Sequence, residues 1–317
     1  MKQAPASGYN PLMNSDTPRP EISPGGPAGL DGRALVILLL GAAAISLAPN
    51  FVRLSEIGPS ATAFYRLFFA LPALFLWMRL EPMDSAEERP TSLRDYLGLG
   101  LAGMFFAADM AFWHWSITLT SVANATLLAN SAPIFVTLGG FLLFGERFSR
   151  RFLMGLVCAV LGALLLLGDS VGLGERHLLG DALGIGAAVF YAAYLMAVAR
   201  LRGRFSTATV MGWSGLVSAI VLIPVTVISG ESFVATSAFG WAVLVALALI
   251  SQVGGQSMIA YALAHLTPAF GAVGLLLQPV LAALIAWILF AEGLGPLQLA
   301  GAAVILAGVV LARLGSR

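Results

Sequence analysis

Two stretches of this chain carry the same pattern of residues in the same order. The first is SVANATLLANSAPIFVTLGGFLLFGERFSRRFLMGLVCAVLGALLLL at 121–167, and the second is LTPAFGAVGLLLQPVLAALIAWILFAEGLGPLQLAGAAVILAGVVL at 266–311. A shift of 146 residues superposes a proline, a Leu-Phe pair, a glutamate and two glycines: Pro133 on Pro279, Leu143-Phe144 on Leu289-Phe290, Glu146 on Glu292, Gly155 on Gly301 and Gly162 on Gly308. This shared register indicates an internal repeat.

The composition of the chain is that of a membrane protein. Its 317 residues are 59% hydrophobic and 10% charged, with a mean hydropathy of +0.90, whereas a soluble domain has about 25% charged residues. The net charge of +1 argues against a nucleic-acid surface. A single cysteine, Cys158, excludes an intrachain disulfide, and the three histidines lack zinc-site spacing. We expect no metal and no cofactor.

Ten apolar segments follow a polar N-terminal tail. Residues 1–30 hold six of the 16 prolines, so we expect a disordered cytoplasmic tail. The first apolar run begins near Ala34, too late for a signal peptide. A spanning helix needs about 20 mostly apolar residues. The candidate spans lie near 34–53, 59–79, 96–117, 121–144, 151–168, 179–199, 206–228, 238–262, 266–290 and 296–313.

The basic residues predict the orientation of these spans. If the N-terminus is cytoplasmic, the inner segments hold 14 of the 17 Lys and Arg residues, and the outer segments hold only Arg53 and Arg176. Basic residues in loops resist translocation, so both termini are predicted to be cytoplasmic, in a bacterial inner membrane. Each half of the chain then has five spans. Because five is odd, the second half is inverted, which is a physical basis for alternating access around a site at the midplane.

The two quoted stretches resemble the end of an EamA domain. That pattern has small residues and a mid-helix proline, then an apolar run into Gly-Glu, then a helix with two glycines seven residues apart. The chain is therefore similar to the drug/metabolite transporter superfamily, with EamA repeats at 31–169 and 178–315. The resemblance implies a ten-helix carrier of amino acids, other metabolites or sugar-linked nucleotides. One departure is Ala291-Glu292 in the place of Gly145-Glu146.

Two ionisable residues within the spans are the first candidates for a substrate site, because such residues are costly in a bilayer. Arg66 and Asp109 lie roughly 10 Å and 12 Å from the outer ends of their spans at about 1.5 Å per residue. Their repeat counterparts are Gly212 and Gly255, so the shared scaffold does not require them. Two alternatives remain open. In one, they form a permanent pair between helices; in the other, Arg66 binds a substrate carboxylate or Asp109 carries a coupling proton.

Uncharged polar residues and prolines extend this candidate site. The Asn130 amide, at a similar depth, can bind substrate or bridge helices. Asn50 lies next to Pro49, where a helix break would expose polar backbone to the cavity. Paired helix interruptions in two repeats point to a binding site, although a kink that only improves packing is the alternative. The candidates are Asn50, Asn130, Gln252, Gln256 and Gln278 for binding, and Pro133 and Pro279 for the helix kinks.

Aromatic residues are dense in the third span. Trp113 and Phe105 lie four residues on either side of Asp109 and share its helix face. They could stack on a substrate or face lipid in an interfacial belt. Further candidates for the wall are Tyr65, Tyr191 and Tyr194. We interpret His114 as an ordinary interfacial histidine, Glu146 and Glu292 as structural residues near arginines, and the repeated glycines as packing residues.

An enzyme and a channel are the competing classes. Gly212-Trp213-Ser214-Gly215 is similar to the GxSG motif of rhomboid intramembrane proteases, but neither His114 nor His265 is placed to activate Ser214. We find no filter motif of a channel and no phosphate-binding loop for ATP. The sequence predicts a secondary transporter of a small polar metabolite, either amino-acid-like or carboxylate-bearing. Its expected partners are the substrate and the lipid bilayer, with no nucleic acid, and it acts as a monomer or a homodimer.

Overall fold

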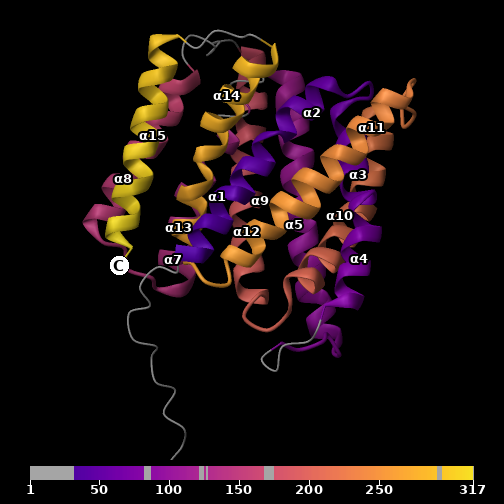
Figure 1. The fold of residues 1–317 in the computed structure, drawn as a ribbon, viewed down its shortest axis with the longest axis horizontal. Helices are drawn as coiled ribbons and strands as arrows, with labels where there is room; N and C mark the ends of the chain where they lie inside the picture. Colours follow the sequence, from indigo (N-terminus) through magenta and orange to yellow (C-terminus); the bar gives the residue numbers. More distant parts are fainter. Residues whose placement is uncertain are drawn as a thin grey trace, which may run out of the picture.

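The chain folds into a bundle of helices (Figure 1). The computed structural model describes residues 32–81, 87–120, 125, 128–167, 175–290 and 295–316. The predicted tail at 1–30 and Glu292 lie outside them. The elements are α1 (Gly32–Ser46), α2 (Ala48–Leu54), α3 (Pro59–Phe68), α4 (Ala70–Leu80), α5 (Leu93–Leu119), α7 (Ala132–Phe144), α8 (Arg150–Leu167), α9 (Glu175–Leu201), α10 (Thr207–Ser229), α11 (Ala238–Ala246), the π-helical segment η2 (Leu247–Gln256), α12 (Ser257–Ala262), α13 (Pro268–Leu275), α14 (Leu277–Phe290) and α15 (Pro296–Gly315).

The ends of the helices form two faces of the bundle. The lower face in Figure 1 carries the connections at 87–92, 145–149, 202–206 and 263–267, together with the end of α15. The upper face carries the connections at 55–58 and 230–237.

Eight segments of the described residues are long and apolar enough to cross a membrane. They are Gly32–Leu54, Pro59–Leu80, Leu93–Leu119, Leu178–Leu201, Thr207–Ser229, Ala238–Ala262, Pro268–Ile285 and Pro296–Gly315. The prediction of an all-helical integral membrane protein is therefore confirmed. The fourth and fifth predicted spans overlap α7, with 13 residues, and α8, with 18. The count of ten spans stays a prediction.

Three of the spans are interrupted close to a proline. The breaks lie at Leu47 before Pro49, at Phe69 before Pro72 and at Leu276 before Pro279. Pro133 lies in the first turn of α7. Proline lacks an N–H and clashes with the carbonyl four residues earlier, so a helix bends or ends beside it. At membrane depth such backbone is tolerated where it is buried in protein or lines a cavity.

The two halves of the chain interlock rather than forming separate bundles. In the first half, α1 packs against η2, α12 and α14 of the second half. In the second half, α9 and α10 pack against α5 of the first. One continuous apolar core connects them, and it includes Leu38, Phe106, Leu195 and Phe270.

The last helices of the two halves, α8 and α15, lie side by side and approach closely at glycines (Figure 1). A Cβ atom added to Gly155 would lie 2.3 Å from the backbone nitrogen of Ala312, and one added to Gly308 would lie 2.5 Å from that of Ala159. Both distances are shorter than any van der Waals contact. Only glycine at these positions allows the two backbones to pack at this separation.

We predict that Gly308→Leu separates α8 from α15. The added side chain would overlap backbone that cannot move aside, which we expect to cost about 3 kcal/mol of stability. Thermal unfolding of the purified protein in detergent measures this loss. The matched control is Ala303→Leu, which adds similar bulk on the exposed side of the same helix. Equal melting temperatures for the two variants would contradict the packing role.

On the upper face, two glutamates cap helices across the fold. Glu56, between α2 and α3, accepts hydrogen bonds from the backbone nitrogens of Thr236 at 2.8 Å and Ser237 at 2.9 Å, and from both of their hydroxyls. Glu231, between α10 and α11, accepts one from the backbone nitrogen of Ala61 at 2.9 Å. The carboxylates thereby satisfy free N–H groups at the starts of α11 and α3.

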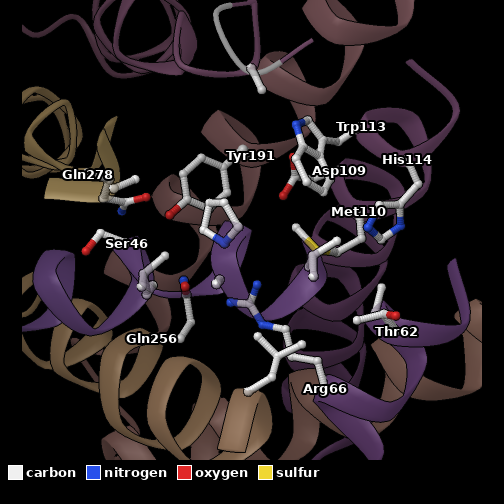
Figure 2. Close-up of a pocket in the computed structure, with 18 of the residues that line it drawn as sticks. Ser46, Thr62, Arg66, Asp109, Met110, Trp113, His114, Tyr191, Gln256 and Gln278 are labelled. Carbon is white, nitrogen blue, oxygen red and sulfur yellow. The ribbon is translucent and has the colours of Figure 1, made fainter. Parts of the chain in front are cut away.

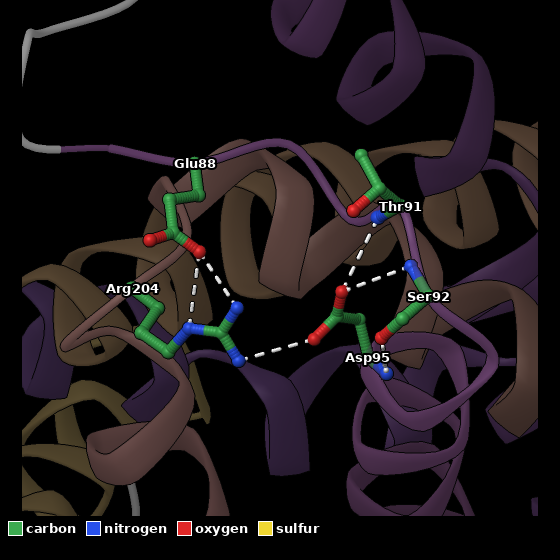
Figure 3. Close-up of polar contacts among 5 residues, drawn as sticks. All are labelled: Glu88, Thr91, Ser92, Asp95 and Arg204. Atoms are coloured by element: carbon green, nitrogen blue, oxygen red, sulfur yellow. Dashed lines mark hydrogen bonds and ion pairs between the residues drawn. The ribbon is translucent and has the colours of Figure 1, made fainter.

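On the lower face, an arginine ties two connections together (Figure 3). Arg204 donates to Glu88 through Nε at 3.1 Å and Nη2 at 2.6 Å, and to Asp95 through Nη1 at 3.1 Å. Asp95 also accepts from the backbone nitrogens of Thr91 and Ser92, and Ser92 caps α5 in return. This capping box explains why α5 begins at Leu93, before the predicted start at 96.

The cap at Glu56 predicts a pH dependence of stability. Hydrogen bonds from Ser237 and Thr236 lower the pKa of Glu56 from 4.5 to about 2. The pKa of Glu56 is lower in the folded protein than in the unfolded chain. The contribution of the ionised carboxylate to the free energy of unfolding is therefore complete above the unfolded value of 4.5 and is lost as the pH falls toward 2. We expect Glu56→Gln to melt below the wild type by a constant margin between about pH 8 and pH 5, and the margin to shrink in more acid buffer.

Thermal unfolding of the purified protein across this pH series provides the measurement. Thr236→Val is the control, because it removes one hydrogen bond and no ionisable group. A margin for Glu56→Gln that stays constant down to pH 3 would contradict the assignment.

Candidate functional site

A cavity of about 170 Å³ lies in the centre of the molecule, lined by both halves of the chain (Figure 2). Its walls come from α1 and α2, α3, α5, α9, η2 and α14. The interrupted helices contribute the residues at their breaks, with Pro49 from α2 and Pro279 from α14. Backbone irregularity and the cavity thus coincide, as expected for non-helical backbone at membrane depth.

Arg66 on α3 directs its guanidinium into this cavity (Figure 2). Its side chain is 8% exposed. Nε donates to Oε1 of Gln252 at 2.9 Å, and the guanidinium carbon lies 5.8 Å from the centre of the Phe106 ring. An arginine has five N–H donors. The two terminal nitrogens make no hydrogen bond to the described residues, so most of this binding capacity is open to a ligand.

Asp109 on α5 lines the same cavity and is also buried. Figure 2 shows it directed into the space that Arg66 borders. The two side chains interact electrostatically, but they form no ion pair within 4 Å. The permanent Arg66–Asp109 pair of the sequence analysis is therefore absent from this structure. The carboxylate makes no hydrogen bond to the described residues, so it too has free capacity for a ligand.

Three of the predicted amides also line the cavity: Asn130, Gln256 and Gln278. Gln256 donates to the Tyr194 hydroxyl at 3.4 Å. The amide nitrogen of Gln278 is buried and has no partner in the described part of the chain. A buried donor without a partner costs free energy, which a ligand acceptor in the cavity would recover.

The aromatic wall comes from one stripe of α5. Phe106, Met110 and Trp113 line the cavity together with Asp109, whereas Phe105 packs outside it. These positions follow the spacing i, i+3, i+4, i+7 of one helix face. Phe105 was predicted to share the helix face of Asp109, but in the structure it is Phe106 that lines the cavity with Asp109. Phe106 also stacks on Tyr194, with ring centres 4.6 Å apart.

Four of the predicted amides and tyrosines lie outside the cavity lining. Gln252 and Tyr194 bond to the side chains of the lining residues Arg66 and Gln256, whereas Tyr65 and Asn50 bond to backbone carbonyls. The Tyr65 hydroxyl donates to the Phe233 carbonyl at 2.8 Å, and its ring packs on Trp241. Asn50 donates to the carbonyl of Ser46 at 3.4 Å, where the α1–α2 break disturbs the backbone. Asn50 was predicted from its place beside Pro49 and Tyr65 from its aromatic side chain, and neither observation says which side of a helix faces the cavity. Pro133 also lies outside the lining, in contrast to Pro279.

His114 corrects a further expectation. It is buried and lines the cavity, and its Nδ1 has no partner in the described part of the chain. The sequence placed it near the membrane surface because it lies close to the end of its span. The helix packs so that this turn faces inward instead. Ser46 and Thr62 are further polar lining residues that sequence reasoning missed. The sequence features that could have pointed to them are the helix break directly after Ser46 and the position of Thr62 one turn before Arg66.

Ser214 has a structural environment. Its hydroxyl donates to the Val210 carbonyl at 2.6 Å within α10. A Cβ atom on Gly103 would lie 2.4 Å from the Ser214 carbonyl, so this serine stands at the close contact of α10 with α5. The GxSG motif therefore marks helix packing.

The chain matches the EamA-like transporter family over residues 32–168 and 178–314. It belongs to that family. Within the EamA-like family, the chain is 27% identical over 263 residues to a probable terminal-alkyne amino-acid exporter of Streptantibioticus cattleyicolor, covering 82% of this chain and 86% of that protein. It is 26% identical over 208 residues to a pseudopaline exporter of Pseudomonas aeruginosa, covering 66% and 72%. This EamA-family chain is a transporter rather than an enzyme.

A solved structure shares the fold of this EamA-family chain. The crystal structure of a protein superposes with a TM-score of 0.76 at 20% sequence identity, covering 90% of this chain and 98% of the other. The resemblance to the drug/metabolite transporters that the two quoted stretches suggested is confirmed by the family match and the exporter relatives. As a transporter, the chain moves a small molecule and resides in lipid.

We predict that Arg66 and Gln252 are energetically coupled. A buried hydrogen bond to a charged group contributes about 2 kcal/mol, so Arg66→Met and Gln252→Leu should show a coupling energy of that size in a double-mutant cycle. Chemical unfolding in detergent provides the four stabilities. Ser257→Ala serves as control in place of Gln252→Leu, because the Ser257 hydroxyl is buried without a partner. Additive effects of Arg66→Met and Gln252→Leu would contradict the bond.

Proposed function

We propose that this chain exports a small zwitterionic metabolite of the amino-acid type by alternating access. The observation that carries the proposal is the presence of Arg66 and Asp109 on one cavity, each buried and each with free hydrogen-bonding capacity. A substrate carboxylate matches the forked donors of a guanidinium. A substrate ammonium group matches Asp109. The amides of Asn130 and Gln278 complete the polar side.

The apolar residues that line the cavity beside Asp109 and Arg66 favour an apolar side chain on that metabolite. Phe106, Met110, Trp113 and Tyr191 present rings and a thioether to the cavity, which suit apolar groups. A volume of about 170 Å³ restricts the ligand to a small molecule. The relative named as a probable terminal-alkyne amino-acid exporter supports both the substrate class and the direction of transport. Passive channel activity has no such support.

We also propose that the lower face is cytoplasmic in a bacterial inner membrane. The basic residues of the connections after α7 and α9 gather there, and they resist translocation. The α5 residues that line the central cavity, from Phe106 to His114, lie in the half of that helix nearer the upper face, which favours exchange of substrate with that face. Because the two halves are inverted repeats, each can adopt the conformation of the other, and this exchange would open the site to the lower face.

The substrate class can be tested with a probe and two blocked analogues. L-propargylglycine, a terminal-alkyne amino acid, keeps both charges; its methyl ester lacks the carboxylate and its N-acetyl derivative lacks the ammonium group. We expect the wild type to be stabilised thermally only by the unmodified probe. Each lost charged hydrogen bond should weaken binding by about tenfold or more.

Matched variants separate the two charges. Arg66→Gln should bind the probe and its methyl ester equally weakly, while Asp109→Asn should do the same for the probe and its N-acetyl derivative. Ser257→Ala should behave as the wild type. The proposal fails if the wild type does not bind the probe, or if Arg66→Gln still discriminates against the methyl ester.

A further inference from the structure

A second cavity of about 350 Å³ opens near the lower face, away from the central site. It lies between the lower ends of α7, α9 and α12 and the start of α13, so both halves of the chain contribute to it. Val136, Met196 and Leu263 give it apolar walls, and Glu146 and Arg200 give it charge.

The internal repeat relates this lower cavity to the central one. The upper side of the central cavity is framed by α1–α2, α5 and α14. Their counterparts in the other half of the chain are α9, α12 and α7, which frame the lower cavity. Val136 in the lower cavity and Ala282 in the central one occupy equivalent positions at the 146-residue shift. In an inverted repeat, the lower cavity is thus the counterpart of the upper side of the central cavity.

Short segments of buried residues separate the two cavities. Gln256 lines the central cavity and Leu263 the lower one, about 10 Å apart along the chain at about 1.5 Å per residue. Along the shared helices, Leu195, Ile259 and Phe270 lie between the two and are fully buried.

The charges of the lower cavity are not neutralised by each other. Among the described residues, Glu146 and Arg200 form no ion pair within 4 Å, and Glu146 forms none with the neighbouring Arg147, Arg150 or Arg151. The structural role expected of Glu146 stays a prediction. Arg200 lies in the last turn of α9, with its guanidinium carbon 5.0 Å from the centre of the Phe144 ring, and its guanidinium N–H groups donate no hydrogen bond to the described residues. Like the central site, this cavity has one cation, one carboxylate and apolar walls, but Arg200 is exposed and Glu146 half-buried.

We propose that the lower cavity is a loading site, in which Arg200 binds the carboxylate and Glu146 the ammonium group of the zwitterionic substrate before it reaches Arg66. This inference rests on the proposed function. It adds a second binding site, on the face from which an exporter receives its substrate.

Uptake of L-propargylglycine from each face tests the loading site. Inside-out membrane vesicles expose the lower face, and right-side-out vesicles expose the upper face. We expect Arg200→Gln to raise the half-saturating concentration for uptake from the lower face about fivefold, which is the upper range for the loss of an exposed charge pair. The half-saturating concentration from the upper face should stay unchanged. Arg200→Lys should restore most of the affinity. Arg147→Gln, which removes a neighbouring charge outside the cavity, should match the wild type.

Thiol protection tests binding directly. Ala199→Cys on a Cys158→Ser background places the single thiol in the lower cavity. L-propargylglycine should slow its labelling by a membrane-impermeant maleimide in inside-out vesicles. Protection should persist when Arg66→Gln weakens the central site and disappear with Arg200→Gln. Absence of protection, or equal loss of affinity from both faces, would overturn the loading site.

The outcomes distinguish this inference from the proposed function. If the wild type does not bind the probe, both fail. If Arg66→Gln abolishes transport while Arg200→Gln behaves as the wild type from both faces, the loading site alone fails. If the Arg200→Gln effect disappears after reconstitution into phosphatidylcholine vesicles, Arg200 binds an anionic lipid headgroup, and the loading site is again overturned.

Discussion

The cost of a polar group in hydrocarbon governs this structure. Every backbone N–H and C=O at membrane depth needs a partner within the protein, which imposes helices throughout the described spans. The same cost restricts where a helix can break. The breaks near Pro49 and Pro279 occur where the chain borders the central cavity, because polar backbone can be accommodated there. The constraint that builds the scaffold thus also locates its site.

The buried guanidinium of Arg66 extends this reasoning to side chains. A cation in this position must be compensated, and Gln252 of the opposite half supplies one acceptor while Phe106 supplies a ring face. Compensation is incomplete, since the terminal nitrogens and Asp109 keep unused capacity. A purely structural pair would bring the two charges together. Their separation at one cavity is the observation on which we base the proposal that they bind a charged ligand.

The sequence predicted which helices form the site better than it predicted which side chains on those helices point into the cavity. Arg66, Asp109, Asn130, Trp113, Gln256 and Gln278 all reach the cavity. Tyr65 and Asn50 do not, and His114 does although it was assigned to the membrane surface. Depth along a span follows from counting residues. The direction of a side chain around the helix depends on which neighbours the helix packs against, and no single span contains that information.

The sequence by itself determined the membrane location, the internal repeat and the rarity of charge within the spans, because these follow from composition, periodicity and the cost of burying ions. Only the tertiary structure decided that Gln252 binds Arg66, that Phe106 rather than Phe105 faces the cavity, and that Glu146 and Arg200 share a second one. Each of these arrangements depends on helices that are far apart in the chain. Their partners are selected by the packing of interlocked halves, which local sequence patterns do not specify.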